Sequence, residues 1–155
     1  MEGIGNIGVN EVRTMVEKHI QVTGNTPILI IDYLQILAPS NERATDKQNT
    51  DKAVLELKRI SRDFKMPVIG ISSFNRDNYN NPVGMQSFKE SGAIEYSSDV
   101  LIGSQFKGVG ESGFDANEAK ARNPREVELV ILKNRNGQTG TNLELDFYAM
   151  FNYFE

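Results

Sequence analysis

Three short apolar runs constrain the fold of this 155-residue chain more than any other feature. The runs are ILIID at 28–32, VIGIS at 68–72 and VLIG at 100–103, and β-branched residues dominate them. A short run that is apolar at nearly every position is typical of a strand buried on both faces, as in a parallel sheet. Helical patterns alternate with these runs, so the sequence predicts a mostly parallel sheet covered by helices, with right-handed crossovers.

Two longer segments have apolar residues at helical spacing. The first covers residues 11–22, with Asn10 near its N-cap, and the second covers 50–64 and ends before Pro67. Between the first apolar run and the second helix, residues 38–51 are polar and rich in turn formers. This composition predicts a mobile surface loop, in which the charges of Arg43 and Lys47 are interpreted as solvated.

The second half of the chain changes character. Residues 104–126 show no apolar periodicity and are rich in Gly, Asn and charge, which predicts a flexible excursion. Two strand-like runs then flank Asn136 and Gly137, and both of these residue types tolerate positive φ. We therefore expect a C-terminal β-hairpin with its turn at this pair, and residues 150–155 offer one more edge strand.

Composition excludes several classes of site. The chain has no cysteine and a single histidine, His19, so disulfides, thiolate metal sites and a histidine-rich zinc site are excluded or implausible. A formal net charge of −4 argues against a generally basic surface but allows a local basic groove. The length predicts a single domain over residues 1–155, and without a signal-peptide pattern or long apolar run we expect a cytoplasmic protein without membrane contact.

The chain opens with Gly3, Gly5 and Gly8, which fit the spacing G-x-G-x-x-G of dinucleotide-binding loops. That loop needs a strand before it to aim the phosphate at a helix N-terminus, and only two residues precede Gly3. A dinucleotide-dependent oxidoreductase would also need a catalytic acid or base near its substrate. The glycines are therefore interpreted as a turn that leads into the first helix.

Asp32 closes the first apolar run. An aspartate at this position lies at the carboxyl edge of a parallel sheet, where ligands of open α/β folds bind, and it can orient a magnesium-bound water beside nucleotide phosphates. The alternative is an aspartate that caps the strand by bonding to local backbone. The surrounding motifs favour the first interpretation.

Four motifs carry a resemblance to a known family. YLQIL after Asp32, then VIGISSFNR, SFKESGAIEYSSD and ILKNRNGQTGT, resemble in order and spacing the second half of the ATPase domain of DnaB-type replicative helicases. The resemblance runs from about Ile7 to Phe147 and implies an α/β fold of the RecA-like P-loop NTPase class. The core fragment would have a mostly parallel sheet, helices on both faces and the C-terminal β-hairpin.

The resemblance implies a nucleotide site. Asp32 matches the Walker B acid that positions Mg²⁺ through water, and Ser73 occupies the place of the family's glutamine that senses the γ-phosphate. Lys133 and Arg135 match a pair that reaches across a subunit interface to the neighbour's ATP, with the arginine as a finger on transition-state charge. Taken alone, the alternation of these two residues predicts one shared face beside the turn, and a solvated turn is the alternative.

A DNA site is implied by the same resemblance. Lys89, Glu90, Ser91 and Gly92 match a loop that grips single-stranded DNA phosphates in the ring lumen, and Arg76 is assigned to the same contact. Lys89 replaces the usual arginine, which keeps the charge but loses the bidentate fork. Phosphate gripping of this kind is sequence-independent and sensitive to salt.

The family's phosphate loop, G-x-x-x-x-G-K-[ST], does not occur in these 155 residues. The resemblance therefore predicts the second half of a bacterial or phage-encoded helicase ATPase domain that uses ATP and Mg²⁺ in a hexameric ring when complete. The isolated chain is expected to bind nucleotide poorly, to be inactive, and to self-associate through an exposed sheet edge. Primase or a helicase loader are the further partners implied. The alternative is a non-catalytic RecA-like module that binds or regulates a helicase ring.

Overall fold

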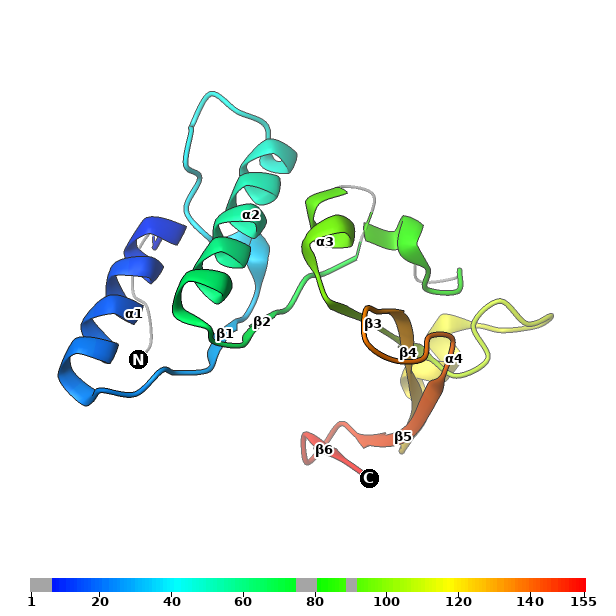
Figure 1. Cartoon of the computed structure of the whole chain (residues 1–155). Helices are drawn as coiled ribbons and strands as arrows, with labels where there is room; N and C mark the ends of the chain where they lie inside the picture. The colour runs from blue at the N-terminus through cyan, green and yellow to red at the C-terminus, as the bar shows by residue number, and fades with distance from the viewer. Residues whose placement is uncertain (1–6, 75–80, 89–91) are drawn as a thin grey trace. The chain divides into compact units, whose positions relative to one another are not determined.

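The structure, a computed structural model, describes residues 7–74, 81–88 and 92–155. The chain divides into two compact units, one within Met1–Ser73 and Glu90–Ser97, the other within Phe74–Lys89 and Ser98–Glu155. Figure 1 labels the elements of both, and each unit is considered by itself. Within the described ranges, no helix is long and apolar enough to cross a bilayer.

The first unit contains the parallel strands. Its elements are α1 (Val9–Thr23), β1 (Leu29–Ile31), the 3₁₀ turn η1 (Leu34–Ile36), α2 (Asp46–Phe64), β2 (Val68–Gly70) and α3 (Gly92–Ser97). β1 and β2 pair in parallel, with Leu29 opposite Val68 and Ile31 opposite Gly70. The parallel pairing predicted for the first two apolar runs is confirmed.

The core of this unit forms where α1 and α2 turn their apolar sides inward. The buried side chains are Val9, Val12 and Val16 of α1, Ala53, Leu57 and Ile60 of α2, and Ile31, Leu34 and Met66. Arg13 ties the two helices together, since its guanidinium lies 2.6 Å from the Asp63 carboxylate and 5.4 Å from the centre of the Phe64 ring. α3 is held to α2 by the Ala93 amide, which donates to Asp51 Oδ1 at 3.2 Å.

The polar loop before α2 is shorter and better bonded than its composition predicts. The helix begins at Asp46, because Thr45 caps it and forms a reciprocal capping box with Gln48. Asn49 of the first turns reaches back into the loop. Its Oδ1 accepts from the Asn41 amide at 3.1 Å, and its Nδ2 donates to the Asn41 carbonyl at 3.0 Å. The predicted helix start at residue 50 is therefore wrong, and the remaining loop is tied to the helix.

The second unit is an antiparallel sheet. Its elements are η3 (Met85–Phe88), β3 (Val100–Phe106), α4 (Ala116–Ala121), β4 (Arg125–Asn134), β5 (Asn142–Tyr148) and β6 (Tyr153–Phe154). The strand order is β3-β4-β5-β6 with each neighbouring pair antiparallel, and β6 is the edge strand predicted at the end of the chain. The third apolar run was expected in the parallel sheet, yet it pairs antiparallel with the long strand β4. The expectation that these strands are buried on both faces is also wrong, since Ile30 is 61%, Ile69 52% and Ile102 51% exposed. Apolar content predicts a strand but names neither its partner nor the faces that are covered.

The segment predicted as a flexible excursion contains regular structure. β3 extends to Phe106, and α4 is capped by Asp115, whose Oδ1 accepts from the Asn117 amide at 2.7 Å and the Glu118 amide at 3.2 Å. β4 then begins at Arg125. The flexibility of 104–126 stays a prediction, but an irregular segment throughout is wrong.

The predicted C-terminal hairpin is present as β4 and β5, but its turn differs from the expected one. The strands are joined by residues 135–141, and neither Asn136 nor Gly137 has positive φ. The left-handed residue is Gly140, with φ of 73°, and its amide donates to the Ile131 carbonyl at 2.8 Å. β4 continues past this pairing because its last residues bond to β3, so the connection must span a longer gap than a two-residue turn.

Candidate functional site

Asp32 directly follows β1 at the carboxyl end of the parallel pair, and its side chain is exposed. The backbone pairing continues beyond the strands: the Ile71 amide donates to the Ile31 carbonyl at 2.9 Å, and the Leu34 amide donates to the Ile71 carbonyl at 2.8 Å. The peptide bond between Asp32 and Tyr33 is cis. The backbone on both sides of Asp32 is therefore fixed to the neighbouring strand, and the expected position at the sheet edge is confirmed.

The loops that follow the two parallel strands are joined by side chains. Gln35 Nε2 donates to Ser72 Oγ at 2.9 Å, which ties η1 to the segment after β2. Ser73, the expected sensor position, comes next and is exposed. Asp32 and Ser73 thus follow two paired strands at the same edge of the sheet, as the sequence predicts. The hydrogen bond between Gln35 and Ser72 was not predicted from the sequence.

The carboxylates of the described residues limit what kind of metal site is possible. Among residues 7–74, 81–88 and 92–155, no group of three or more His, Cys, Asp or Glu residues is arranged to hold a metal ion. Mg²⁺ is commonly held by one or two carboxylates together with substrate phosphates and waters. A lone exposed carboxylate such as Asp32 fits that donor set and does not fit a cage made of protein ligands alone.

Lys133 and Arg135 lie at the end of β4 in the second unit. Lys133 is half-buried in the strand opposite Leu101, whereas Arg135 is the first residue beyond the strand. The shared face predicted for Lys133 and Arg135 stays a prediction for Arg135. Its position is set by Asp99: the Arg135 amide donates to the Asp99 carbonyl at 2.9 Å, and its guanidinium pairs with Asp99 Oδ1 at 3.1 Å. The Arg135 side chain remains 54% exposed.

The residues assigned to DNA are only partly described. Gly92 is the first residue of α3 and is half-buried, whereas Arg76, Lys89, Glu90 and Ser91 lie outside the described residues. The described part of this region is the segment 81–88. Asp32, Ser73 and Gly92 belong to the first unit, and Lys133 and Arg135 to the second.

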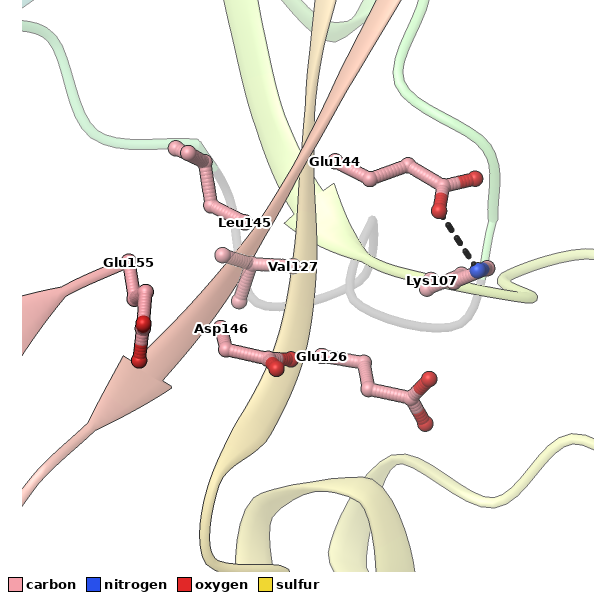
Figure 2. Close-up of a pocket in the computed structure, with 7 residues that line it drawn as sticks. All are labelled: Lys107, Glu126, Val127, Glu144, Leu145, Asp146 and Glu155. Atoms are coloured by element: carbon pink, nitrogen blue, oxygen red, sulfur yellow. Dashed lines mark hydrogen bonds and ion pairs between the residues drawn. The ribbon is translucent and has the colours of Figure 1, made fainter.

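A hollow of about 240 Å³ lies on the sheet of the second unit. Figure 2 shows its lining, which is Lys107, Glu126, Val127, Glu144, Leu145, Asp146 and Glu155. Lys107 Nζ lies 2.7 Å from Glu144 Oε2, and this hydrogen bond raises the pKa of the Lys107 ammonium. The hollow contains none of the residues that the sequence assigns to nucleotide or DNA.

Comparison with protein families matches residues 2–155 to the DnaB-like helicase C terminal domain. The chain belongs to this family. The match covers both units, from α1 through the antiparallel sheet.

Several curated proteins are similar in sequence to this chain. It is 29% identical over 152 residues to the replicative DNA helicase DnaC of Bacillus subtilis (strain 168), and 27% identical over 153 residues to a probable replicative DNA helicase of Trieres chinensis. In both cases 96% of the chain matches 32% of the relative. The chain therefore spans about a third of the length of these relatives.

Solved structures support the fold of the DnaB-like domain. A DnaB-like replicative helicase, solved in a study of its interactions with primase, superposes with a TM-score of 0.78 at 21% identity over 96% of this chain and 35% of that one. A second solved structure, that of an ATPase domain, superposes with a TM-score of 0.75 at 22% identity over 96% of this chain and 51% of that one. The RecA-like α/β class is confirmed.

Proposed function

We propose that the chain is part of an ATP-dependent replicative DNA helicase, in which ATP hydrolysis drives movement along single-stranded DNA and duplex unwinding by a hexameric ring. One observation carries the proposal: Asp32 lies at the carboxyl edge of the parallel pair on a backbone bonded to the next strand. The family match and the names of the relatives, which are replicative DNA helicases, support the same function.

On the nucleotide side, Asp32 orients a water bound to Mg²⁺, and Ser73 faces the γ-phosphate. The ion supplies charge neutralisation at the phosphates when it is bound. Because phosphoryl transfer depends on positioning and electrostatics, the fixed backbone around Asp32 is the feature that suits this role. The Gln35–Ser72 bond joins the segment after β2 to the turn that follows Asp32.

Arg135 and Lys133 act on the ATP of the adjacent protomer. A guanidinium has five N–H donors, and the bond to Asp99 leaves others for a phosphate oxygen. Its exposure allows it to reach a second protomer, and an arginine finger supplied in this way accelerates hydrolysis by about 10³-fold or more. Lys133 adds a second positive charge beside it.

On the DNA side, Lys89, Glu90, Ser91, Gly92 and Arg76 contact the phosphates of single-stranded DNA. A helicase loader and primase are the proposed protein partners, the second because one solved neighbour was studied for its interactions with primase. The isolated chain is inactive, because no G-x-x-x-x-G-K-[ST] loop occurs in its 155 residues to cradle the β-phosphate.

Subunit mixing tests the nucleotide site. In a chimaera, this chain replaces the matching 152 residues of the Bacillus subtilis relative. Asp32→Asn and Arg135→Ala variants of the chimaera are purified separately. Each is expected to lose ATPase activity, and the mixture is expected to regain part of it, because an intact Asp32 then meets an intact Arg135 across an interface. Loss without recovery on mixing would exclude an arginine that acts between protomers, and full activity of the Asp32→Asn chimaera would exclude the Walker B role.

Oligonucleotide binding tests the DNA site in the chain itself. Fluorescence anisotropy with a labelled oligo-dT is expected to show weak, salt-sensitive binding that Lys89→Ala reduces at every salt concentration. Lys120→Ala, which removes an exposed charge on α4, is the matched control. Equal binding by wild type and Lys89→Ala would contradict the assignment.

A further inference from the structure

Three polar side chains on adjacent strands of the second unit form a hydrogen-bonded relay. Gln105 of β3 donates through Nε2 to Glu128 Oε1 of β4 at 2.5 Å, and Asn142 of β5 donates through Nδ2 to Glu128 Oε2 at 2.8 Å. Glu128 thus uses both carboxylate oxygens, one toward each neighbouring strand. The relay lies outside the nucleotide and DNA residues considered above.

The chemistry of the relay fixes its direction. An ionised carboxylate only accepts hydrogen bonds, so Gln105 must turn its side-chain NH2 group toward Glu128. Its carbonyl oxygen then faces away, and it accepts from the Val83 amide at 2.6 Å. A backbone amide can only donate, so donors and acceptors match along the whole path from Val83 to Asn142.

Val83 belongs to the segment 81–88, which precedes Lys89 in sequence. The segment approaches β3 closely: a Cβ added at Gly103 would lie 2.5 Å from Val83 Cγ2, and one added at Gly110 would lie 2.5 Å from Pro82 Cγ. Within the segment, the Gly84 amide donates to Ser87 Oγ at 3.1 Å. Its position is thus set by two glycines and by the Val83–Gln105 bond.

The far end of the relay lies at the base of the hairpin. Asn142 is the first residue of β5 and directly follows the connection 135–141, which begins with Arg135. One carboxylate therefore bonds, through Gln105, to the segment that precedes Lys89 and, through Asn142, to the connection that carries the proposed finger.

We propose that Glu128 is a positioning residue. It holds the segment 81–88 in the position that the DNA contact requires, and it links this segment to the hairpin of β4 and β5, whose connection carries Arg135. The proposal rests on the proposed function, which assigns DNA to Lys89. It adds a requirement that the motifs do not contain: DNA affinity depends on the hydrogen bonds that join Gln105, Glu128 and Asn142 across three strands.

Two replacements of Glu128 that remove the same charge test the relay. In Glu128→Met both acceptor oxygens are removed, so Gln105 loses the partner that orients its NH2 group away from Val83. In Glu128→Gln the new carbonyl oxygen can still accept from Gln105, and Asn142 can turn its own carbonyl oxygen toward the new NH2 group, so both bonds are kept. Glu144→Gln is the control, because Glu144 lies directly opposite Glu128 in the sheet and is paired with Lys107.

Two measurements are made on the 155-residue chain: hydrogen exchange at the Val83 amide, and anisotropy with labelled oligo-dT. In Glu128→Met we expect the Val83 amide to exchange about tenfold faster and the dissociation constant for DNA to rise about tenfold, the loss typical of one bond to a charged group. Glu128→Gln and Glu144→Gln are expected to keep both values at those of wild type. Should Glu128→Met fail to fold, Gln105→Met removes the acceptor for the Val83 amide and is expected to raise both values in the same way.

Other outcomes overturn the proposal. Unchanged Val83 exchange in Glu128→Met, or exchange in Glu128→Gln as fast as in Glu128→Met, shows that the relay does not position the segment. Faster exchange with unchanged DNA binding, in a chain where Lys89→Ala does weaken binding, rejects the positioning role and leaves the proposed function intact. If Lys89→Ala binds as wild type, the DNA assignment itself fails, and the functional part of this proposal fails with it.

Discussion

Arg135 is bound to Asp99 twice, once through its backbone amide at 2.9 Å and once through its guanidinium at 3.1 Å. The two bonds differ in their dependence on the Asp99 side chain, because only the second needs the carboxylate. An acid just before β3 therefore aims the arginine, while the backbone bond holds the end of β4.

Asp99→Ala is expected to change the free energy of unfolding by less than about 1 kcal/mol, because both side chains of the pair are more than half exposed and the backbone bond remains. Chemical denaturation measures the difference. Arg122→Ala, which removes another exposed ion pair with Glu126, is the control for a small effect. A loss above about 2 kcal/mol would mean that Asp99 supports the unit rather than aims Arg135.

Acid stability should depend on Arg13. The hydrogen bond from Arg13 lowers the pKa of the Asp63 carboxyl below its ordinary value. The resulting stability is present above about pH 4 and is lost as pH falls through the folded-state pKa. NMR titration of Asp63 should show its midpoint move upward in Arg13→Met and stay in place in Lys18→Met. An identical midpoint in all three proteins would contradict the ion pair.

Gly103→Ala should destabilise the second unit, because the new methyl group would lie 2.5 Å from Val83 Cγ2 and 2.8 Å from Cγ1. Overpacking of this kind costs about 1–3 kcal/mol. Thermal unfolding should show the loss, and Val83→Ala in the same chain should recover part of it. The neighbouring Ser104→Ala, at an exposed position of the same strand, is expected to be neutral.

The first unit should depend on Ile60, whose side chain is 1% exposed. Ile60→Ala is expected to cost about 2–5 kcal/mol, because it removes buried methyl groups and leaves a cavity. Leu55→Ala removes a similar volume from the same helix at a position that is 49% exposed, so its cost should be much smaller. Equal losses in urea denaturation would argue against the helix packing.

Local patterns predicted the elements better than their pairing. The β-branched runs predicted β1, β2 and β3, but nothing in VLIG distinguishes a strand that pairs in parallel from one that pairs with β4. The Asn136–Gly137 signal predicted the hairpin correctly and its turn wrongly, because β3 holds the end of β4 and lengthens the connection. A turn rule that considers two residues cannot include a third strand.

The position of a candidate site residue was predictable where it follows from one strand alone. Asp32 at a strand end is such a case. The relay from Gln105 to Asn142 and the Asp99–Arg135 pair join residues 36 or 37 positions apart in sequence, counted from the residue numbers, and they depend on strand register. Charge and periodicity give no sign of such register, so these contacts become visible only with the sheet.

The bonds that Asn49 makes to Asn41 turn a polar stretch into a closed loop, and we expect that closure to slow cleavage by proteases. Arg43 lies inside the closed segment, where trypsin would need an extended backbone to cut. The rate of cleavage after Arg43 thus reports on a single asparagine side chain, and mass spectrometry can read it without any knowledge of activity.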